Sequence, residues 1–144
     1  TGSAATLGSE SVFESATVSY TNAAFDSNSN KVVVAYNDGG NSSSGTAVVG
    51  TVSGSSITFG TPAVFNSGSN TEWISVAFDS NSNKIVIAYM DAGNSSYGTA
   101  IVGTVSNTSI SFGSEVVFNS GSSTRMDMCF DSRNSIGDIN IFWK

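Results

Sequence analysis

Histidine is absent from this chain of 144 residues, which contains one cysteine and one proline. Without histidine a Ser-His-Asp or Cys-His catalytic arrangement is impossible, and the imidazole ligands common in zinc sites are missing. The single cysteine, Cys129, excludes a disulfide within the chain. Its flanking residues predict a strand position, and we expect a core thiol because free cysteines are usually buried.

Charge is also scarce, since Asp, Glu, Lys and Arg make up 11% of the residues and the formal net charge is -6. The basic residues form no cationic track that could neutralise phosphates, so we expect no nucleic-acid partner. No apolar run is long enough to span a bilayer, and no cationic leader precedes an apolar stretch. We therefore expect a soluble chain without membrane insertion. Its abundance of Ser, Asn, Thr and Gly is typical of secreted or virion-type β proteins.

An internal repeat dominates what is present. The residues Phe-Asp-Ser-Asn-Ser-Asn-Lys occur at 25–31 and return at 78–84, a spacing of 53. At the same spacing 45–47 returns at 98–100, 50–53 at 103–106, and 64–68 at 117–121. A period of this length indicates a propeller blade or another stacked unit.

Each full period contains four β segments bounded by Gly, Asn, Asp or Ser clusters. In the second period they are 73–78, 84–89, 99–105 and 109–118. The short connections predict an antiparallel meander. The second segment is apolar on consecutive residues, so both faces of its sheet must be covered. Because no segment has helical periodicity, we expect neighbouring copies of the sheet to provide the cover, as in propeller blades.

The phase of the repeat divides one all-β domain into four parts. These are an N-terminal fourth strand (1–15), repeat 1 (16–68), repeat 2 (69–121) and a partial repeat 3 (122–144) that has only a first and second strand. Three four-stranded blades are too few to surround an axis, so we expect an incomplete β-propeller ring that oligomerisation completes, or a piece of a longer repeat protein. A contact that does not close would give a filament. A β-prism or β-trefoil is the alternative fold.

The repeat resembles a known group of proteins. Phe-Asp-Ser-Asn-Ser-Asn-Lys precedes Val-Val-Val-Ala-Tyr, and Gly-Thr-Ala-Val-Val-Gly-Thr-Val-Ser precedes Ile-Thr-Phe-Gly-Thr-Pro-Ala-Val-Phe-Asn-Ser-Gly. This pattern is similar to propeller-type repeats of marine bacteriophage and bacterial surface or tail-associated proteins. The resemblance covers nearly the whole chain and implies an adhesive module on a virion or cell surface. It transfers no catalytic or ligand residue.

Residues 26–30 and 79–83 alternate Asp, Ser and Asn like the first half of a calcium loop. The second half is missing, because Lys31 and Lys84 stand where such loops need glycine. Asp and Asn also dominate hairpin turns, since they bond to the local backbone. We therefore predict turns here, with calcium as the alternative, and we expect no metal site or other cofactor.

The connection between the second and third strands is polar, begins with Asp, and is longer than a tight hairpin needs. In a meander it should share an edge with the connection from the fourth strand to the next repeat. That edge collects Asp38, Asn41, Asn66, Glu72, Asp91, Asn94, Tyr97, Asn119 and Arg125. Amides and carboxylates beside an aromatic ring suit sugar hydroxyls and pyranose faces, so these residues are a candidate glycan site. A solvated loop face is the alternative.

Large apolar residues recur at two further repeat positions. They are Tyr20, Trp73 and Met126 at the start of the first strand, and Tyr36, Tyr89 and Trp143 on the second strand. Because each recurs at a fixed position of the repeat, we predict packing between sheets, rather than a sugar platform, for both groups.

The sequence thus predicts a non-enzymatic module, extracellular or on a virion surface, that binds a host glycan or receptor through repeated loops. No catalytic residue is assigned, because glycosidase chemistry needs an asymmetric pair of carboxylates and Asp38 and Asp91 are repeat equivalents. The alternative function is a self-assembling structural subunit of a decoration, fibre or filament. In that case the N-terminal strand would complement a neighbouring copy in a homo-oligomer.

Overall fold

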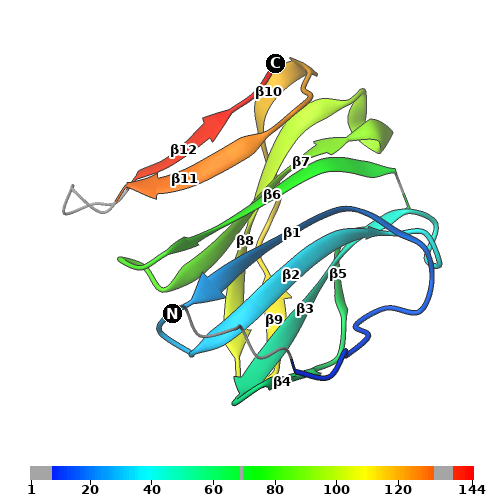
Figure 1. Ribbon diagram of the computed structural model, residues 1–144. Helices are drawn as coiled ribbons and strands as arrows, with labels where there is room; N and C mark the ends of the chain where they lie inside the picture. The colour runs from blue at the N-terminus through cyan, green and yellow to red at the C-terminus, as the bar shows by residue number, and fades with distance from the viewer. Residues whose placement is uncertain (1–7, 69, 132–137) are drawn as a thin grey trace, which may run out of the picture.

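The computed structural model describes residues 8–68, 70–131 and 138–144, which form three antiparallel β-sheets (Figure 1). Sheet A contains β1 (Val18–Asp26), β2 (Lys31–Asp38), β3 (Ser44–Ser53), β4 (Ser56–Phe59) and β5 (Ala63–Asn66). Sheet B contains β6 (Thr71–Asp79), β7 (Lys84–Asp91), β8 (Tyr97–Ser106), β9 (Ser109–Phe112) and β10 (Val116–Ser122), with the 3-10 helix η1 (Ala92–Asn94) before β8. Sheet C contains β11 (Asp127–Asp131) and β12 (Asp138–Phe142). In this described part of the chain, no helix has the length and hydropathy needed to cross a membrane.

Sheets A and B are the expected meanders. β1 pairs with β2, β2 with β3, and both β4 and β5 with the other edge of β3; β6 to β10 repeat this pattern. The single fourth strand predicted at 109–118 is therefore two short strands along one edge. In sheet A the break falls at Gly60, which still donates to the Val49 carbonyl at 2.9 Å, and at Pro62, which has no N–H to donate.

Each sheet has two faces because alternate residues of a strand point to opposite sides. The tyrosine face carries Phe25, Val32, Val34, Tyr36 and Val48 in sheet A, and Phe78, Ile85, Ile87, Tyr89 and Ile101 in sheet B. The alanine face carries Ala24, Val33, Ala35, Ala47 and Val49 in sheet A, and Ser75, Ala77, Val86, Ala88 and Ala100 in sheet B. In sheet C, Phe130, Ile139, Ile141 and Trp143 occupy the tyrosine face, and Asp127, Cys129, Asn140 and Phe142 the alanine face.

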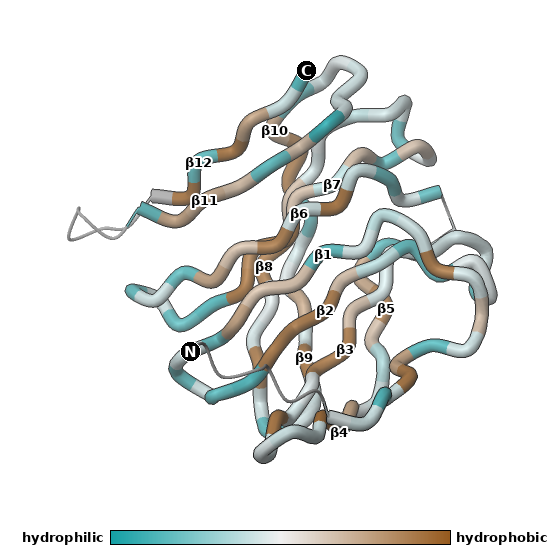
Figure 2. The backbone as a smooth tube through the Cα atoms, in the orientation of Figure 1, coloured by the Kyte–Doolittle hydropathy of each residue, from teal (hydrophilic) through white to brown (hydrophobic). Residues whose placement is uncertain are grey.

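The sheets stack so that the alanine face of one covers the tyrosine face of the next. Val33 and Ala35 belong to the same hydrophobic cluster as Ile85 and Tyr89, and the first strands β1, β6 and β11 lie next to one another (Figure 1). Figure 2 shows hydrophobic residues concentrated on the strands and hydrophilic ones in the connections. The expectation that neighbouring sheets cover both faces of the second strand is confirmed for β7, where Ile85, for example, has no exposed surface. For β2 it holds on the alanine face only, because the tyrosine face of sheet A is packed by Phe13 and residues of sheet A itself.

One aromatic contact occurs three times along the stack. The ring centroids are 5.1 Å apart for Phe13 and Tyr36, 5.2 Å for Phe65 and Tyr89, and 5.2 Å for Phe118 and Trp143. Phe65 and Phe118 come from the fourth strands β5 and β10, whereas Phe13 precedes sheet A. Residues 8–15 contain no strand, so the N-terminal strand expected at 1–15 is not formed in its described part. Phe13 nevertheless covers Tyr36 as Phe65 covers Tyr89.

Two expectations about burial are wrong. Cys129 is exposed, because it lies on the alanine face of sheet C, which no described strand covers. Trp143 packs on Phe118 but keeps 45% of its surface exposed, whereas Tyr36 and Tyr89 have none. Trp143 is more accessible because sheet C provides two strands in place of the full set around each tyrosine.

Candidate functional site: the polar edge of the stack

The connections that leave the strands at one edge of the stack form what we call the polar edge. It comprises the described residues of the connections 39–43, 67–70, 92–96 and 123–126. The Thr71 amide donates to the Ser43 carbonyl at 3.2 Å, and the Ser123 amide to the Ser96 carbonyl at 3.1 Å. Each second-to-third connection is thus bonded to the chain that leads into the next sheet, and the two kinds of connection share an edge as the meander predicts.

Asp38 and Asp91 begin the longer connections, but both are buried, with 8% and 7% of their surface exposed. Their carboxylates accept the amides of Gly40 at 2.9 Å and Gly93 at 3.0 Å. These contacts are Asx turns, in which a side chain bonds to the backbone two residues further on. Both carboxylates hold the start of a loop and present little surface to a ligand.

The other predicted residues divide into supports and accessible groups. Asn66 is buried in β5, Tyr97 is half-buried, and the Asn119 amide donates to the Ser123 hydroxyl at 2.8 Å. Asn41, Asn94 and Arg125 are exposed, and Glu72 is half-buried. The nine residues therefore lie in the polar edge or on the strands next to it, without joining into a single site.

Tyr20 and Trp73 lie in β-bulges at the polar ends of β1 and β6, where the pairing register shifts. φ is 50° at Tyr20 and 52° at Trp73, a left-handed conformation that bulky residues rarely adopt. Bulges re-aim side chains, and here they bring two rings together across the boundary between sheets A and B. The ring centroids are 5.3 Å apart and the planes are inclined by 54°.

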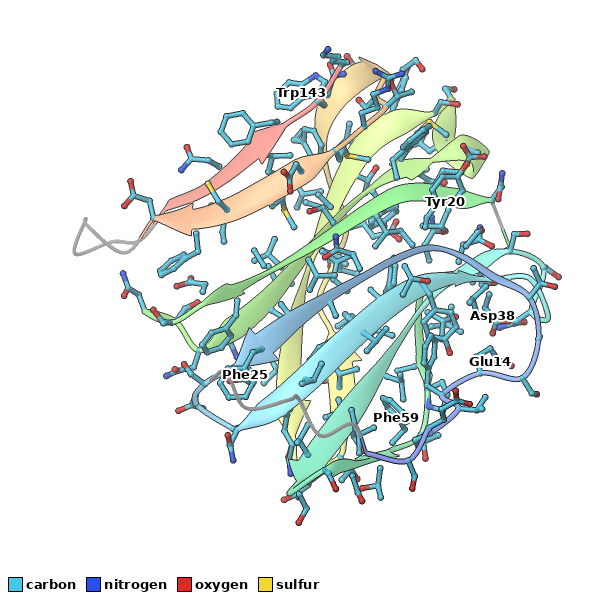
Figure 3. All side chains as sticks on the ribbon, in the orientation of Figure 1. Glu14, Tyr20, Phe25, Asp38, Phe59 and Trp143 are labelled. Atoms are coloured by element: carbon cyan, nitrogen blue, oxygen red, sulfur yellow. The ribbon has the colours of Figure 1, made fainter. Side chains whose placement is uncertain are left out.

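Glu72 bonds to this aromatic pair. The Tyr20 hydroxyl donates to Glu72 Oε2 at 3.2 Å, and the Asn70 amide donates to Glu72 Oε1. Tyr20 is 36% exposed, and Figure 3 shows it at the same end of the strands as Asp38. Desolvation, and then the charge and hydrogen bond of Glu72, raise the pKa of Tyr20, so its hydroxyl is a proton donor at neutral pH. We call Tyr20, Trp73, Glu72 and Asn70 the aromatic cluster.

The third copy of the bulge position holds Arg125, whose φ is 53°. Alignment of the internal repeats predicted Met126 at this position, which is wrong by one residue. Thr124 and Lys144 exchange two backbone hydrogen bonds of 2.8 and 2.9 Å, which fix the register before sheet C. Arg125 is therefore the first bulge residue, and Met126 is buried in the core.

The prediction that Tyr20 and Trp73 pack between sheets is correct in part, because their rings contact one another. It missed their accessibility and their link to Glu72. The signal in the sequence is that an aromatic residue directly follows a polar one, Ser19 or Glu72, at the start of a strand in both repeats. A bulge is what turns that residue out of the sheet.

The Asp-Ser-Asn-Ser-Asn segments are hairpin turns, as predicted. Asp26 Oδ1 accepts the amides of Asn28 at 2.9 Å and Ser29 at 3.0 Å, and Oδ2 accepts the Ser29 hydroxyl at 2.7 Å. Asn30 closes the turn with a φ of 57°. Asp79 is bonded in the same way in the second repeat. Across residues 8–68, 70–131 and 138–144, no three His, Cys, Asp or Glu side chains gather as metal ligands would.

The aromatic cluster combines an exposed ring, a carboxylate and an amide, which together can stack on an apolar surface and bond to hydroxyl groups. Each carboxylate oxygen has a second lone pair beyond the bond it already accepts. The chain matches no protein-family model, no curated protein and no solved structure.

Proposed function

We propose that this chain is a non-catalytic binding module of an extracellular or virion surface that holds a host glycan or other receptor at its polar edge. The contact of Tyr20 and Trp73, with Glu72 bonded to the tyrosine hydroxyl, carries this proposal. An amphipathic aromatic ring offers a flat apolar surface and a polar tip, and both match a pyranose ring. Glu72 and Asn70 would bond to the sugar hydroxyls.

Charge favours a neutral ligand. The formal net charge of -6 would repel a strongly anionic chain, and the carboxylate of Glu72 lies beside the rings. Arg125, one sheet further along, is an exposed cation that would accommodate an acidic substituent at the end of the ligand. A linear, mainly neutral hexose oligosaccharide fits this order of groups.

Two observations support binding without catalysis. The chain contains no histidine, which excludes the commonest general base. Glu72 is held by Tyr20 and Asn70 on an open edge, whereas catalytic sites generally exclude water from the reacting groups.

The stacking of the sheets supports a propeller-like architecture as the finer form of the fold. In a propeller the first strands of all blades are adjacent and the sheets pack face to face, as β1, β6 and β11 do here. A β-prism or β-trefoil would instead arrange its sheets or hairpins around a central core. The ring itself would need further sheets.

Binding of an array of host-type oligosaccharides tests the proposed function. We expect specific binding by the wild type, and a loss of at least about 10-fold, or about 1.4 kcal/mol, in Tyr20→Ala and Glu72→Gln. Glu115→Gln is the matched control, because Glu115 also accepts a tyrosine hydroxyl, from Tyr89, away from the polar edge. Equal binding by all variants would refute the site.

A second candidate function, a self-assembling structural subunit, is favoured by the segment before β1. Phe13 packs on sheet A as Phe65 of β5 packs on sheet B, so the segment occupies the place of a fourth strand from a preceding sheet. A neighbouring copy could supply the other strands of that sheet. Deleting residues 1–15 should then abolish assembly, whereas Glu72→Gln should leave it unchanged.

A further inference from the structure

The two ends of the stack carry apolar side chains that no described sheet covers. At one end is the tyrosine face of sheet A, where Phe25 is 55% exposed. At the other end is the alanine face of sheet C, where Phe142 is 60% exposed. Figure 3 shows Phe25 at one end of the molecule and Trp143, the residue after Phe142, at the opposite end.

The same kind of face is buried inside the stack. The tyrosine face of sheet B lies under the alanine face of sheet A, and there Ile85 and Ile87 have no exposed surface. Phe78, the equivalent of Phe25, packs against the core. The repeat therefore shows which surface packs on a tyrosine face, namely the alanine face of another sheet.

The segment before β1 covers only part of the open tyrosine face. Phe13 contacts Tyr36 of β2 and Phe59 of β4, with ring centroids 5.1 and 5.7 Å apart. Phe25 of β1 remains exposed, and Val32 at the start of β2 is half-buried. The uncovered part thus spans two strands, and sheet C consists of two strands, β11 and β12. Within the stack, first strand lies against first strand, which would place β11 over β1.

The side-chain sizes on the two open faces are complementary. Sheet A has Val32, Val34 and Val48 where sheet B has Ile85, Ile87 and Ile101. Sheet C has Phe142 where sheets A and B have Ala35 and Ala88. The tyrosine face of sheet A thus carries one methylene fewer at three positions, and the open alanine face carries an additional phenyl ring. Val34 and Val48 are already buried in a cluster with Phe13 and Phe59, so Val32 is the position that a docking sheet would cover. Close packing requires such compensation, because protein interiors tolerate neither voids nor overlap.

We propose that a second copy of this chain docks head to tail, with the alanine face of its sheet C on the tyrosine face of sheet A. Phe142 of one copy packs against the exposed Phe25 and the half-buried Val32 of the other. Asp127 of the docking copy takes the place of Asn22, whose Oδ1 accepts the Val76 amide at 3.3 Å between sheets A and B. This inference goes beyond glycan binding and rests on the second candidate function. The contact is heterologous, so it closes into a ring or continues as a filament.

Light scattering after size exclusion, at several protein concentrations, tests the docking. We expect the wild-type mass to be at least twice that of one chain, and Phe142→Asp and Phe25→Asp each to remain at the mass of one chain. Val117→Asp, on an exposed edge strand of sheet B, is the control and should assemble like the wild type. A 1:1 mixture of Phe142→Asp and Phe25→Asp should form a dimer and nothing larger, because together they retain one intact pair of faces.

Cys129, the single cysteine, gives a second readout because it lies exposed on the docking face of sheet C. We expect its rate of maleimide labelling to fall at least 10-fold from dilute to concentrated wild type, and to stay constant in Phe142→Asp. A wild type that is monomeric at every concentration overturns both self-assembly and this docking, and leaves glycan binding standing. An assembled wild type whose mass Phe142→Asp does not change, or whose Cys129 stays reactive, overturns the docking alone.

Discussion

At the scale of single residues, Tyr36 and Tyr89 show how one repeat position acquires two environments. Both are completely buried, on equivalent strands, beneath an equivalent phenylalanine. The Tyr89 hydroxyl donates to Glu115 at 2.7 Å. Pro62 stands at the equivalent of Glu115 in the first repeat, and Tyr36 Oη has no hydrogen-bond partner among the described residues. The two tyrosines are thus equally buried, but only the Tyr89 hydroxyl has a hydrogen-bond partner among the described residues.

This difference predicts opposite effects of the same substitution. Tyr89→Phe should lower the free energy of unfolding by about 1–2 kcal/mol, because it removes a hydrogen bond to a carboxylate. Tyr36→Phe should leave it unchanged or raise it by up to about 1 kcal/mol, because it removes a buried hydroxyl that lacks a partner. Urea denaturation of the two variants measures both values. Equal losses would show that the two hydroxyls are equally satisfied in solution.

Both tyrosines also make stability depend on alkaline pH. Burial, and then the negative charges of Glu14 and Asp38, raise the pKa of Tyr36 to about 12, and burial with the bond to Glu115 raises the pKa of Tyr89 further. In the unfolded chain both titrate near about 10. Their contribution is therefore fully present below about pH 10 and is lost as the pH rises above it. Urea denaturation between neutral pH and pH 12 should show that the free energy of unfolding falls less steeply with pH in Tyr36→Phe than in the wild type. An identical dependence on pH in both proteins would contradict this.

At the scale of elements, the hairpin turns are the parts that local sequence determines most completely. Asp79 Oδ1 accepts the amides of Asn81 at 2.8 Å and Ser82 at 3.2 Å, and its other oxygen accepts the Ser82 hydroxyl. Desolvation would raise its pKa, but these hydrogen bonds outweigh that effect and lower the pKa of Asp79 below its ordinary value. The ionised carboxylate is therefore the form that stabilises the turn.

We predict that Asp79→Ala lowers the free energy of unfolding by about 1 kcal/mol at neutral pH. Because the pKa of Asp79 is lower in the folded protein than in the unfolded chain, where it is about 4, its carboxylate stabilises the fold above about pH 4. That contribution is lost as the pH falls further. The difference between wild type and variant should therefore shrink in acid, where the protonated carboxyl group accepts the same bonds more weakly. Asp79→Asn is the control, since its amide oxygen can still accept the two backbone bonds. A destabilisation that persists unchanged at low pH would contradict an ionic turn.

Strands and turns could be predicted because their signals lie within a few residues of each other. The consecutive apolar residues of β7 correctly indicated a sheet covered on both faces, whereas β2 has another sheet on its alanine face only. The division of the fourth strand was not predicted, because it depends on how residues near Pro62 pair with β3. The bulges at Tyr20 and Trp73 also depend on pairing, so a sequence pattern could locate these residues but not their accessibility.

At the scale of the whole molecule, burial is decided by the neighbour that a sheet has in the stack. Cys129 occupies the same position as Ala77, which is buried between sheets B and C. It is exposed because the repeat that would cover it is not among the described residues. No local pattern contains that information, and the expectation of a buried thiol was wrong for this reason. Trp143 is accessible for a different reason, because sheet C provides two strands where sheets A and B each provide five.

The stacking also explains how one chain could present weak sites repeatedly. The bulge position recurs once per sheet as Tyr20, Trp73 and Arg125, so assembly of several copies would multiply the polar edge. Linked weak sites bind more tightly than one, provided that a ligand reaches them together. The two proposed functions, glycan binding and self-assembly, are therefore compatible with each other.

The most direct measurement is the fluorescence of Trp73 during titration with hexose oligosaccharides that the array identifies. The chain has two tryptophans, and Trp143→Phe leaves Trp73 as the single reporter while keeping an aromatic ring against Phe118. We predict a saturable change in Trp73 emission whose midpoint equals the dissociation constant from calorimetry. Calorimetric binding without any change in Trp73 emission would contradict a glycan site at the aromatic cluster.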